Sequence, residues 1–414
     1  MREDAATAIV VDDLPPQRRS LRIALVTETY PPEVNGVAST IARVVEGLRA
    51  RNHELQLIRP RQESEEAGDN DGPRFHEILM RGLPIPRYAN LRMGLPATRA
   101  LKTHWMARRP DMVHIATEGP LGWSALQAAL QLKLPVSSDF RTNFHAYSKH
   151  YGIGWLHKPI MAYLRKFHNR TQCTMVPTEE LRRSLMEYGF RNLSVVARGV
   201  DTRLYGPHRR DEILRQAWGA GPDTLVAVHV GRLAPEKNLI TLLAAFDAMR
   251  AINQTAKLVL VGDGPARKWL QTRCPDAIFA GMRSGVDLAA HYASGDFFLF
   301  PSLTETYGNV TVEAMASGLA VLAFDYAAAA QLIRSDDNGL LAPVDDPTLF
   351  VAKASALAND LPRLRTMGER ACERAGALGW DRVLEQIESV FLATISVGPL
   401  VRRAEMLRAQ VQVR

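Results

Sequence analysis

The chain of 414 residues has little cysteine and no long hydrophobic run. Its three cysteines, Cys173, Cys274 and Cys372, lie far apart, and their spacing fits neither a zinc site nor a disulfide framework. We therefore expect buried or inert thiols. No apolar run approaches the roughly 18 residues of a membrane-spanning helix, and Asp325 interrupts the most apolar stretch, residues 319–333. The sequence thus predicts no transmembrane helix.

The first twenty residues lack the apolar core of a signal peptide. They carry four acidic residues before Pro15 and Pro16, a composition typical of a disordered lead-in. From these features we expect a cytoplasmic protein.

The sequence does contain short apolar runs that alternate with helical patterns. Its length favours two or more domains. The expected strands are 23–27, 55–58, 112–115, 136–138, 174–176 and 194–196, then 225–230, 258–261, 277–280, 297–300, 321–324 and 339–341. Strands that alternate with helices form parallel sheets from β-α-β units. Two such series predict an α/β protein with two doubly wound domains.

The expected boundary between the two domains lies just after Gly199, where a polar segment with a proline follows a strand. The predicted segments are a lead-in (1–20), an N-terminal domain (21–203), a C-terminal domain (204–378), a helix (379–395) and a basic C-terminal helix (396–414). The helix over 379–395 is predicted from an apolar stripe with helical spacing.

Positive charge is concentrated in the first half. The net charge is +7, and residues 91–200 hold 16 lysine and arginine residues against 6 acidic ones. A basic face indicates an anionic partner, either membrane lipid or nucleic acid, and a solvated face is the alternative. Residues 155–170 form a basic amphipathic pattern that is typical of a helix in a membrane interface. A core-packed helix with a solvated basic side fits this pattern equally.

Residues 300–318, FPSLTETYGNVTVEAMASG, are the most informative segment. They run from an apolar strand through a polar loop that carries Glu305 into a helix that carries Glu313. The N-terminus of a helix favours anions, because its first N–H groups are unpaired and its dipole is positive there. Phosphate-binding amides between two hydroxyl-binding carboxylates suit a nucleotide sugar. The alternative is that Glu305 is a solvated loop residue and that the carboxylate of Glu313 complements the helix dipole.

Two cations, Arg232 and Lys237, follow the strand over 225–230 on one loop. Ligands bind at this edge of open α/β sheets, and paired cations stabilise the charge that develops when a sugar–diphosphate bond breaks. The pair could instead hold Glu236 in a surface ion-pair cluster. In the first half, Gly36 begins a helix and permits close approach of the backbone to a diphosphate.

These motifs resemble those of the retaining GT-B glycosyltransferases of family four, and the resemblance spans about residues 21–395. Residues 305–313 match the Glu-x7-Glu signature of the family, and residues 231–238 match its Gly-Arg-Leu-x-x-Glu-Lys-Asn pattern. The resemblance implies two Rossmann-like domains that face an interdomain cleft, with the helix over 379–395 crossing back to the first domain. The absence of a Gly-x-Gly-x-x-Gly turn after the first strand counts against a nicotinamide dehydrogenase.

The resemblance also implies roles for individual residues. Glu305 would contact hydroxyls of the donor sugar, Glu313 the ribose, and Arg232 with Lys237 the diphosphate. The other implied donor ligands are Gly36, Gly281, Met282, Arg283, Gly308, Asn309 and Val310. Because the cations and helix amides would replace a metal ion at the diphosphate, neither a metal nor a cofactor is expected.

The acceptor-side catalytic residue is less clearly indicated. Many relatives place a histidine near this part of the first domain, which makes His114 and His145 the candidates, although a histidine at a strand end is usually structural. Arg141 stands where lipid-directed relatives often have histidine, and Glu118 lies in the loop where others have a His-Glu pair. The sequence departs from the family pattern here, and it does not single out the residue that touches the reactive face of the sugar.

The resemblance predicts transfer of mannose or glucose from a GDP- or UDP-sugar with retention of configuration, in which the leaving phosphate accepts the proton of the acceptor. The favoured acceptor is a glycerolipid on the cytoplasmic face of an anionic membrane, because the first domain is basic and residues 324–331 are similar to those of glycerolipid hexosyltransferases. A growing surface polysaccharide is the alternative acceptor. A nucleic-acid-binding protein is the alternative from another class, but the basic stretch lacks the aromatic interleaving of single-strand binders.

Overall fold

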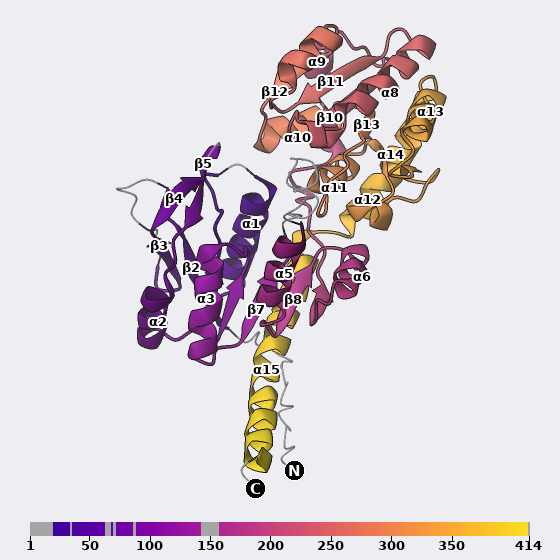
Figure 1. Ribbon diagram of the computed structural model, residues 1–414. Coiled ribbons are helices and arrows are strands. Elements are labelled where there is room, and N and C mark those ends of the chain that lie inside the picture. The colour runs from indigo at the N-terminus through magenta and orange to yellow at the C-terminus, as the bar shows by residue number, and fades with distance from the viewer. Residues whose placement is uncertain are drawn as a thin grey trace, which may run out of the picture.

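The protein consists of two α/β halves, each built around one parallel sheet, in the computed structural model of Figure 1. The structure describes residues 20–33, 35–62, 68, 72–85, 88–141 and 157–412. The last helix, in yellow, leaves the C-terminal half and runs along the N-terminal half. The predicted α/β class with two doubly wound sheets is confirmed.

The N-terminal sheet has seven parallel strands in the order β3-β2-β1-β6-β7-β8-β9. These strands are β1 (Arg22–Val26), β2 (Glu54–Pro60), β3 (Phe75–Met80), β6 (Met112–Ile115), β7 (Val136–Asp139), β8 (Cys173–Val176) and β9 (Leu193–Val195). The helices are α1 (Gly36–Ala50), α2 (Thr98–Ala107), α3 (Pro120–Gln131), α5 (His157–His168) and α6 (Glu179–Glu187). The strand order reverses between β1 and β6, and open α/β sheets bind ligands at such a switch point.

The C-terminal sheet repeats this arrangement with six strands in the order β12-β11-β10-β13-β14-β15. The strands are β10 (Val226–Val230), β11 (Lys257–Val261), β12 (Ile278–Gly281), β13 (Phe297–Phe300), β14 (Ala320–Phe324) and β15 (Gly339–Ala342). The helices are α7 (Glu212–Ala217), α8 (Leu239–Ile252), α9 (Arg267–Arg273), α10 (Gly285–Ala293), α11 (Asn309–Ala316), α12 (Ala327–Leu332), α13 (Pro347–Ala356), α14 (Leu361–Gly376) and α15 (Trp380–Gln412), with short 3-10 turns η2 (Pro207–Arg209) and η3 (Pro235–Lys237). Its switch point lies between β10 and β13.

Both faces of the C-terminal sheet are covered by apolar side chains. Successive residues of a strand point to opposite faces, and in β10 Ala227 belongs to one core cluster while Val226 and Val228 belong to the other. All five residues of this strand are buried. A strand that is buried on both faces needs a continuous apolar run, and such runs were the signal from which the strands were predicted.

All predicted strands are present, with ends shifted by at most two residues, but β3, β4 (Gly82–Ile85) and β5 (Tyr88–Gly94) were not predicted. The edge strand β3 buries Phe75 and leaves its other residues half-buried, and β4 pairs antiparallel with β5 outside the main sheet. Strands covered on one side only do not require a continuous apolar run. The sequence pattern therefore missed them.

The chain crosses between the halves at two adjacent points. Val200 forms a β-bridge with Gly379, and its amide donates a hydrogen bond of 3.0 Å to the carbonyl of Leu378. Further contacts join the halves, including an ion pair of 2.8 Å between Arg43 of α1 and Asp201. The crossing segments therefore lie side by side, and Asp201 contacts the middle of α1.

The final helix α15 packs on the N-terminal half. Its residues Val383, Leu384 and Phe391 are buried in the same cluster as Val44 and Leu48 of α1. The predicted helix over 379–395 and the predicted separate segment from 396 form one continuous helix as far as Gln412. Once a helix exists, each added residue gains a hydrogen bond at little nucleation cost, so the basic segment extends the packed helix.

Helix α5 corresponds to the segment for which a membrane-interface helix was considered. Its apolar residues Met161, Leu164 and Phe167 are buried inside the protein, whereas Lys158 and Arg165 are exposed. The apolar stripe is therefore not available for insertion into a membrane, and the alternative of a core-packed helix with a solvated basic side describes α5 correctly.

No helix within the described ranges is both long enough and apolar enough to cross a membrane. Cys173, Cys274 and Cys372 carry free thiols. Burial raises the pKa of all three, that of Cys173 to about 11, so the unreactive thiol form dominates at neutral pH.

Candidate active site

Lys237 and Glu305 meet at the switch point of the C-terminal sheet. The loop after β10 carries Lys237 and the loop after β13 carries Glu305, and these two strands are hydrogen-bonded neighbours. The ammonium Nζ of Lys237 donates to Oε1 of Glu305. Two predicted donor ligands that are 68 residues apart in the sequence therefore form one ion pair, because parallel strands bring their carboxyl ends to the same edge.

This ion pair is partly buried and well supported. The side chains of Lys237 and Glu305 are 15% and 16% exposed. Ser302 Oγ donates to Glu305 Oε1 at 2.7 Å, and Lys237 Nζ lies 5.5 Å from the centroid of the Phe300 ring. The sequence predicted the two charges as ligands of different parts of a donor. In the protein without a donor they neutralise each other, which reduces the cost of partly burying them.

Arg232 belongs to the same loop but lies beside another carboxylate. Its Nη1 is 3.9 Å from Oε1 of the buried Glu236, and its side chain is 44% exposed. Arg232 therefore lies beside Glu236, whereas Lys237 contacts Glu305.

The N-termini of α11 and α1 face each other across the two halves. Gly308 precedes α11 with a φ of 91°, in the left-handed region that glycine adopts without strain. A Cβ atom built on Gly36 would lie 3.7 Å from Nδ2 of Asn309 and meet nothing nearer. The predicted phosphate-binding residues Gly36, Gly308, Asn309 and Val310 are therefore brought together at the boundary between the halves.

Glu313 lies half-buried in α11, beyond its first turn, and its Oε2 accepts a hydrogen bond of 2.9 Å from the hydroxyl of the buried Tyr292. Burial raises the pKa of Glu313 to about 7, against the opposing effect of the Tyr292 hydrogen bond. Glu313 is therefore partly protonated at neutral pH and can both donate and accept hydrogen bonds, which suits contact with a hydroxyl.

Three of the implied donor ligands, Gly281, Met282 and Arg283, lie at the end of the edge strand β12. Gly281 has a φ of 76°, and the side chain of Met282 is 62% exposed. Arg283 donates to the carbonyl of Ala280 at 2.9 Å and to Asp287 at 3.0 Å. These contacts keep Arg283 on its own loop and leave Met282 as an exposed apolar surface.

Comparison with known proteins agrees with this geometry. Residues 34–204 match the family described as Glycosyltransferase Family 4, and residues 224–360 match Glycosyl transferases group 1. The chain is 36% identical over 331 residues to a GDP-mannose-dependent alpha-mannosyltransferase of Mycobacterium tuberculosis, covering 79% of this chain and 85% of the relative. The protein is a glycosyltransferase. The assignment rests on sequence identity over most of both chains.

Two further comparisons, one of sequence and one of structure, relate this glycosyltransferase to other known proteins. An alpha-monoglucosyldiacylglycerol synthase of Streptococcus pneumoniae is 28% identical over 73% of this chain and 71% of its own. A sucrose-phosphate synthase of Thermosynechococcus elongatus shares the fold, with a TM-score of 0.73 and 18% identity over 91% of this chain and 99% of its own. The predicted GT-B fold is thereby confirmed, and the relatives support hexosyl transfer as the class of reaction.

In the N-terminal half of the glycosyltransferase, His114 is held inside the protein. Its Nδ1 lies 2.9 Å from Ser137 Oγ and its Nε2 lies 3.3 Å from Asp139 Oδ2, and the ring is 5.1 Å from that of Phe391. The side chain is 1% exposed, so contact with a substrate would require these partners to rearrange. The other candidate, His145, lies outside the described residues. The catalytic role of both histidines stays a prediction.

Asp139 forms an ion pair with Arg141. Burial alone would raise the pKa of Asp139, but Arg141 and His114 lower it to about 2. Asp139 is therefore a stable anion between two basic side chains. The arrangement fixes Arg141 at the carboxyl end of β7, next to the boundary between the halves.

The half-buried Glu28 and the buried Glu118, near the switch point of the N-terminal sheet, were not predicted as a cluster. The Glu28 carboxylate accepts from the amides of Gly94 at 2.5 Å and Leu121 at 2.8 Å, and thereby caps α3. Glu118 is 4% exposed, and both of its carboxyl oxygens lack a hydrogen-bond partner in the described part of the chain. Burial, together with the charges of Asp139 and Glu28, raises the pKa of Glu118 to about 8. Glu118 is therefore largely protonated at neutral pH.

Three or more His, Cys, Asp or Glu side chains that could hold a metal ion do not come together anywhere in the described ranges. The expectation that this glycosyltransferase needs no metal and no cofactor stays a prediction.

The loop that carries Arg232 and Lys237 packs against the backbone of Gly262, which follows β11. This residue has a φ of 129°, and a Cβ atom would lie 2.0 Å from the carbonyl oxygen of Gly231. We expect Gly262→Ala to lower the free energy of unfolding by about 2–4 kcal/mol, through backbone strain and steric conflict. Urea unfolding measures the change. Gly376→Ala is the control, because nothing lies within 4 Å of its Cβ position, and equal stability of the two variants would contradict the prediction.

Proposed function

We propose that this glycosyltransferase transfers a hexose, mannose or glucose, from a GDP- or UDP-sugar to a membrane glycerolipid with retention of configuration. The observation that carries the proposal is the Lys237–Glu305 ion pair at the switch point, beside the N-terminus of α11. A donor that enters this place offers an anion to the cation and hydroxyls to the carboxylate. The ion pair would then be replaced by contacts with one small molecule.

In the proposed reaction the residues have separate tasks. Lys237, Arg232 and the first amides of α11 hold the diphosphate, and they stabilise the negative charge that grows on it as the bond to the anomeric carbon breaks. Glu305 binds hydroxyls of the hexose and fixes its orientation. The acceptor oxygen attacks the anomeric carbon on the face that the phosphate leaves. A phosphate oxygen takes the proton of the acceptor hydroxyl, and the bonding electrons of the broken bond stay with the nucleoside diphosphate.

The donor and the acceptor are proposed from the relatives and the surface charge. The name of the M. tuberculosis relative specifies GDP-mannose, and that of the S. pneumoniae relative specifies a diacylglycerol product. The exposed basic side of α5, with Lys158, Arg165 and Lys166, would be attracted to anionic lipid headgroups. We therefore place the enzyme peripherally on the cytoplasmic face of the membrane, held by charge rather than by an inserted helix.

The test is transfer of labelled sugar by the purified protein. A thermal-shift panel of GDP- and UDP-sugars first identifies the donor, because a ligand that binds only the folded state raises its stability. That donor is then incubated with phosphatidylglycerol vesicles that contain diacylglycerol or a monoglycosyl diacylglycerol. We expect label in the lipid fraction with an α-linkage. Label only on a soluble glycan would contradict the lipid acceptor, and a β-linked product from an α-linked donor would contradict retention.

A further inference from the structure

Arg198 is a buried cation at the boundary between the two halves. It lies just before the crossing at Val200 and is 9% exposed. Its Nη1 is 3.4 Å from Oδ1 of Asn309, the first residue of α11, and its Nη2 is 3.5 Å from the carbonyl oxygen of Arg141. The guanidinium carbon lies 5.8 Å from the centroid of the Tyr307 ring. Arg198 thus comes from the N-terminal half and contacts Tyr307 and Asn309 of the C-terminal half.

The charge of Arg198 is not compensated by a carboxylate within ion-pair distance in the part of the chain that the structure describes. The other buried arginines of the described residues are paired: Arg59 with Glu77 at 2.6 Å, and Arg215 with Asp296 at 3.1 Å. Burial and the neighbouring Arg141 lower the pKa of Arg198 to about 10, so it stays charged at neutral pH. Burying a charge without a counterion costs free energy. The presence of such a charge at Arg198 indicates that a ligand supplies the counterion.

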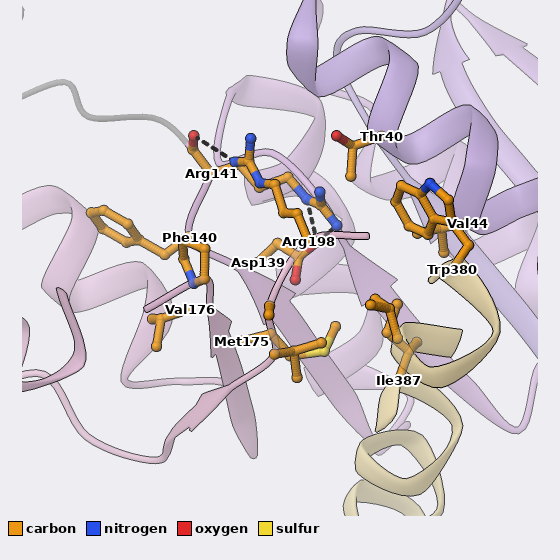
Figure 2. A pocket seen from close by; sticks show the side chains of 14 residues that line it. Thr40, Val44, Asp139, Phe140, Arg141, Met175, Val176, Arg198, Trp380 and Ile387 are labelled. Atoms are coloured by element: carbon orange, nitrogen blue, oxygen red, sulfur yellow. Dashed lines mark hydrogen bonds and ion pairs between the residues drawn. The ribbon is translucent and has the colours of Figure 1, made fainter. Parts of the chain in front are cut away.

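Arg198 lies between a small pocket and the start of α11. Figure 2 shows Arg198 and Arg141 over a pocket whose other wall is formed by Val44, Trp380 and Ile387. The side chains of that wall are apolar and offer no charged group to an anion. Arg198 also reaches Asn309, the first residue of α11, and this polar side suits an anion better than the apolar wall of the pocket.

The same place attracts anions for two further reasons. The N-terminus of α11 carries the positive end of the helix dipole, which repels the guanidinium that lies beside it. On the other side of the Gly308 turn, Lys237 contacts Glu305, whose Cγ would lie 3.6 Å from a Cβ atom on Gly308. A guanidinium, an ammonium and a helix terminus therefore surround one short turn, and an anion between them would be stabilised by all three.

We propose that Arg198 is a further ligand of the donor diphosphate, supplied to the C-terminal donor site by the N-terminal half. The inference rests on the proposed donor site. When the diphosphate binds, it compensates the buried charge, and it ties the segment before Val200 to the start of α11. Arg198 therefore stabilises the complex with the donor at the expense of the ligand-free protein.

The test uses Arg198→Met, which keeps most of the volume and removes the charge, and Arg198→Lys, which keeps the charge. Thermal unfolding is measured without ligand, with GDP and UDP, and with guanosine and uridine. We expect Arg198→Met to unfold at the same or a higher temperature without ligand. We expect its affinity for the nucleoside diphosphate to fall about ten- to hundredfold, as for a lost hydrogen-bonded charge, while nucleoside binding is unchanged. Arg198→Lys is expected to retain part of the diphosphate affinity.

The control is Arg43→Met, which also lies beside the crossing but is paired with Asp201 and is more exposed. It is expected to leave diphosphate affinity unchanged. The inference is overturned if Arg198→Met loses stability without ligand and binds GDP and UDP like the wild type, which is the result for a structural arginine. It is also overturned if the variant raises only the KM for an acidic acceptor, since the anion then belongs to the acceptor. A wild-type protein that neither nucleotide stabilises would contradict the proposed donor site itself.

Discussion

Glu305→Gln is expected to lower the rate of hexose transfer by about a hundredfold or more, the range found when one preorganised charged contact of an active site is removed. The amide keeps the size of the side chain and can still accept from Ser302, but it loses the charge that pairs with Lys237. Because the lost interaction orients the sugar, kcat should fall more than KM rises. Initial rates at saturating donor measure the effect.

The stability of the Glu305→Gln variant separates this role from a structural one. Far-UV circular dichroism should match the wild type, and urea unfolding should show a loss of less than about 3 kcal/mol, because Lys237 loses its counterion at a site that is only partly buried. Glu179→Gln removes a surface carboxylate that pairs with Arg182 and serves as the matched control with unchanged activity. Unchanged turnover in Glu305→Gln would return Glu305 to the alternative of a solvated loop residue.

Glu118→Gln is expected to change how the stability of the protein depends on pH. The pKa of Glu118 is about 8 in the native protein, against 4.5 for an ordinary glutamate. Between these values the native state keeps a proton that the unfolded chain has released, so the free energy of unfolding falls as the pH rises through this window. The loss amounts to something on the order of 4 kcal/mol above pH 8. The side chain of glutamine does not titrate, so the variant does not lose this stability as the pH rises.

Urea unfolding of both proteins from pH 4 to pH 9 tests this difference. The buried amide of the variant changes stability by an amount that is independent of pH, so the slope and not the absolute value carries the test. Relative to the wild type, the variant should gain stability steadily between pH 4.5 and 8 and then remain level. Glu46→Gln, in which an exposed carboxylate is replaced, should run parallel to the wild type. A parallel curve for Glu118→Gln would show that Glu118 is ionised and has found a counterion.

The donor side could be predicted from the sequence to a large extent, whereas the acceptor side could not. The residues after β10 and β13 carry their signal locally, because a strand end, a polar loop and a helix start lie within about ten residues of each other. His114 has no such context. It ends a buried strand, and its partners Ser137 and Asp139 belong to the next strand, so neither its burial nor its hydrogen bonds can be read from its neighbours in the chain.

The amino-acid sequence by itself determined the two series of buried strands, the parallel topology and the placement of Lys237 and Glu305 at one edge of a sheet. These follow from side-chain periodicity and from the geometry of β-α-β units, which act over short stretches of chain. Only the tertiary structure decided that Lys237 contacts Glu305, that both carboxyl oxygens of Glu118 lack a hydrogen-bond partner among the described residues, and that Arg198 reaches Asn309. Arg198 and Asn309 are separated by 111 residues. Burial and charge pairing depend on which distant segments of the chain are packed together in the protein interior, where the dielectric constant is low. Only the packing of the whole chain determines which segments these are.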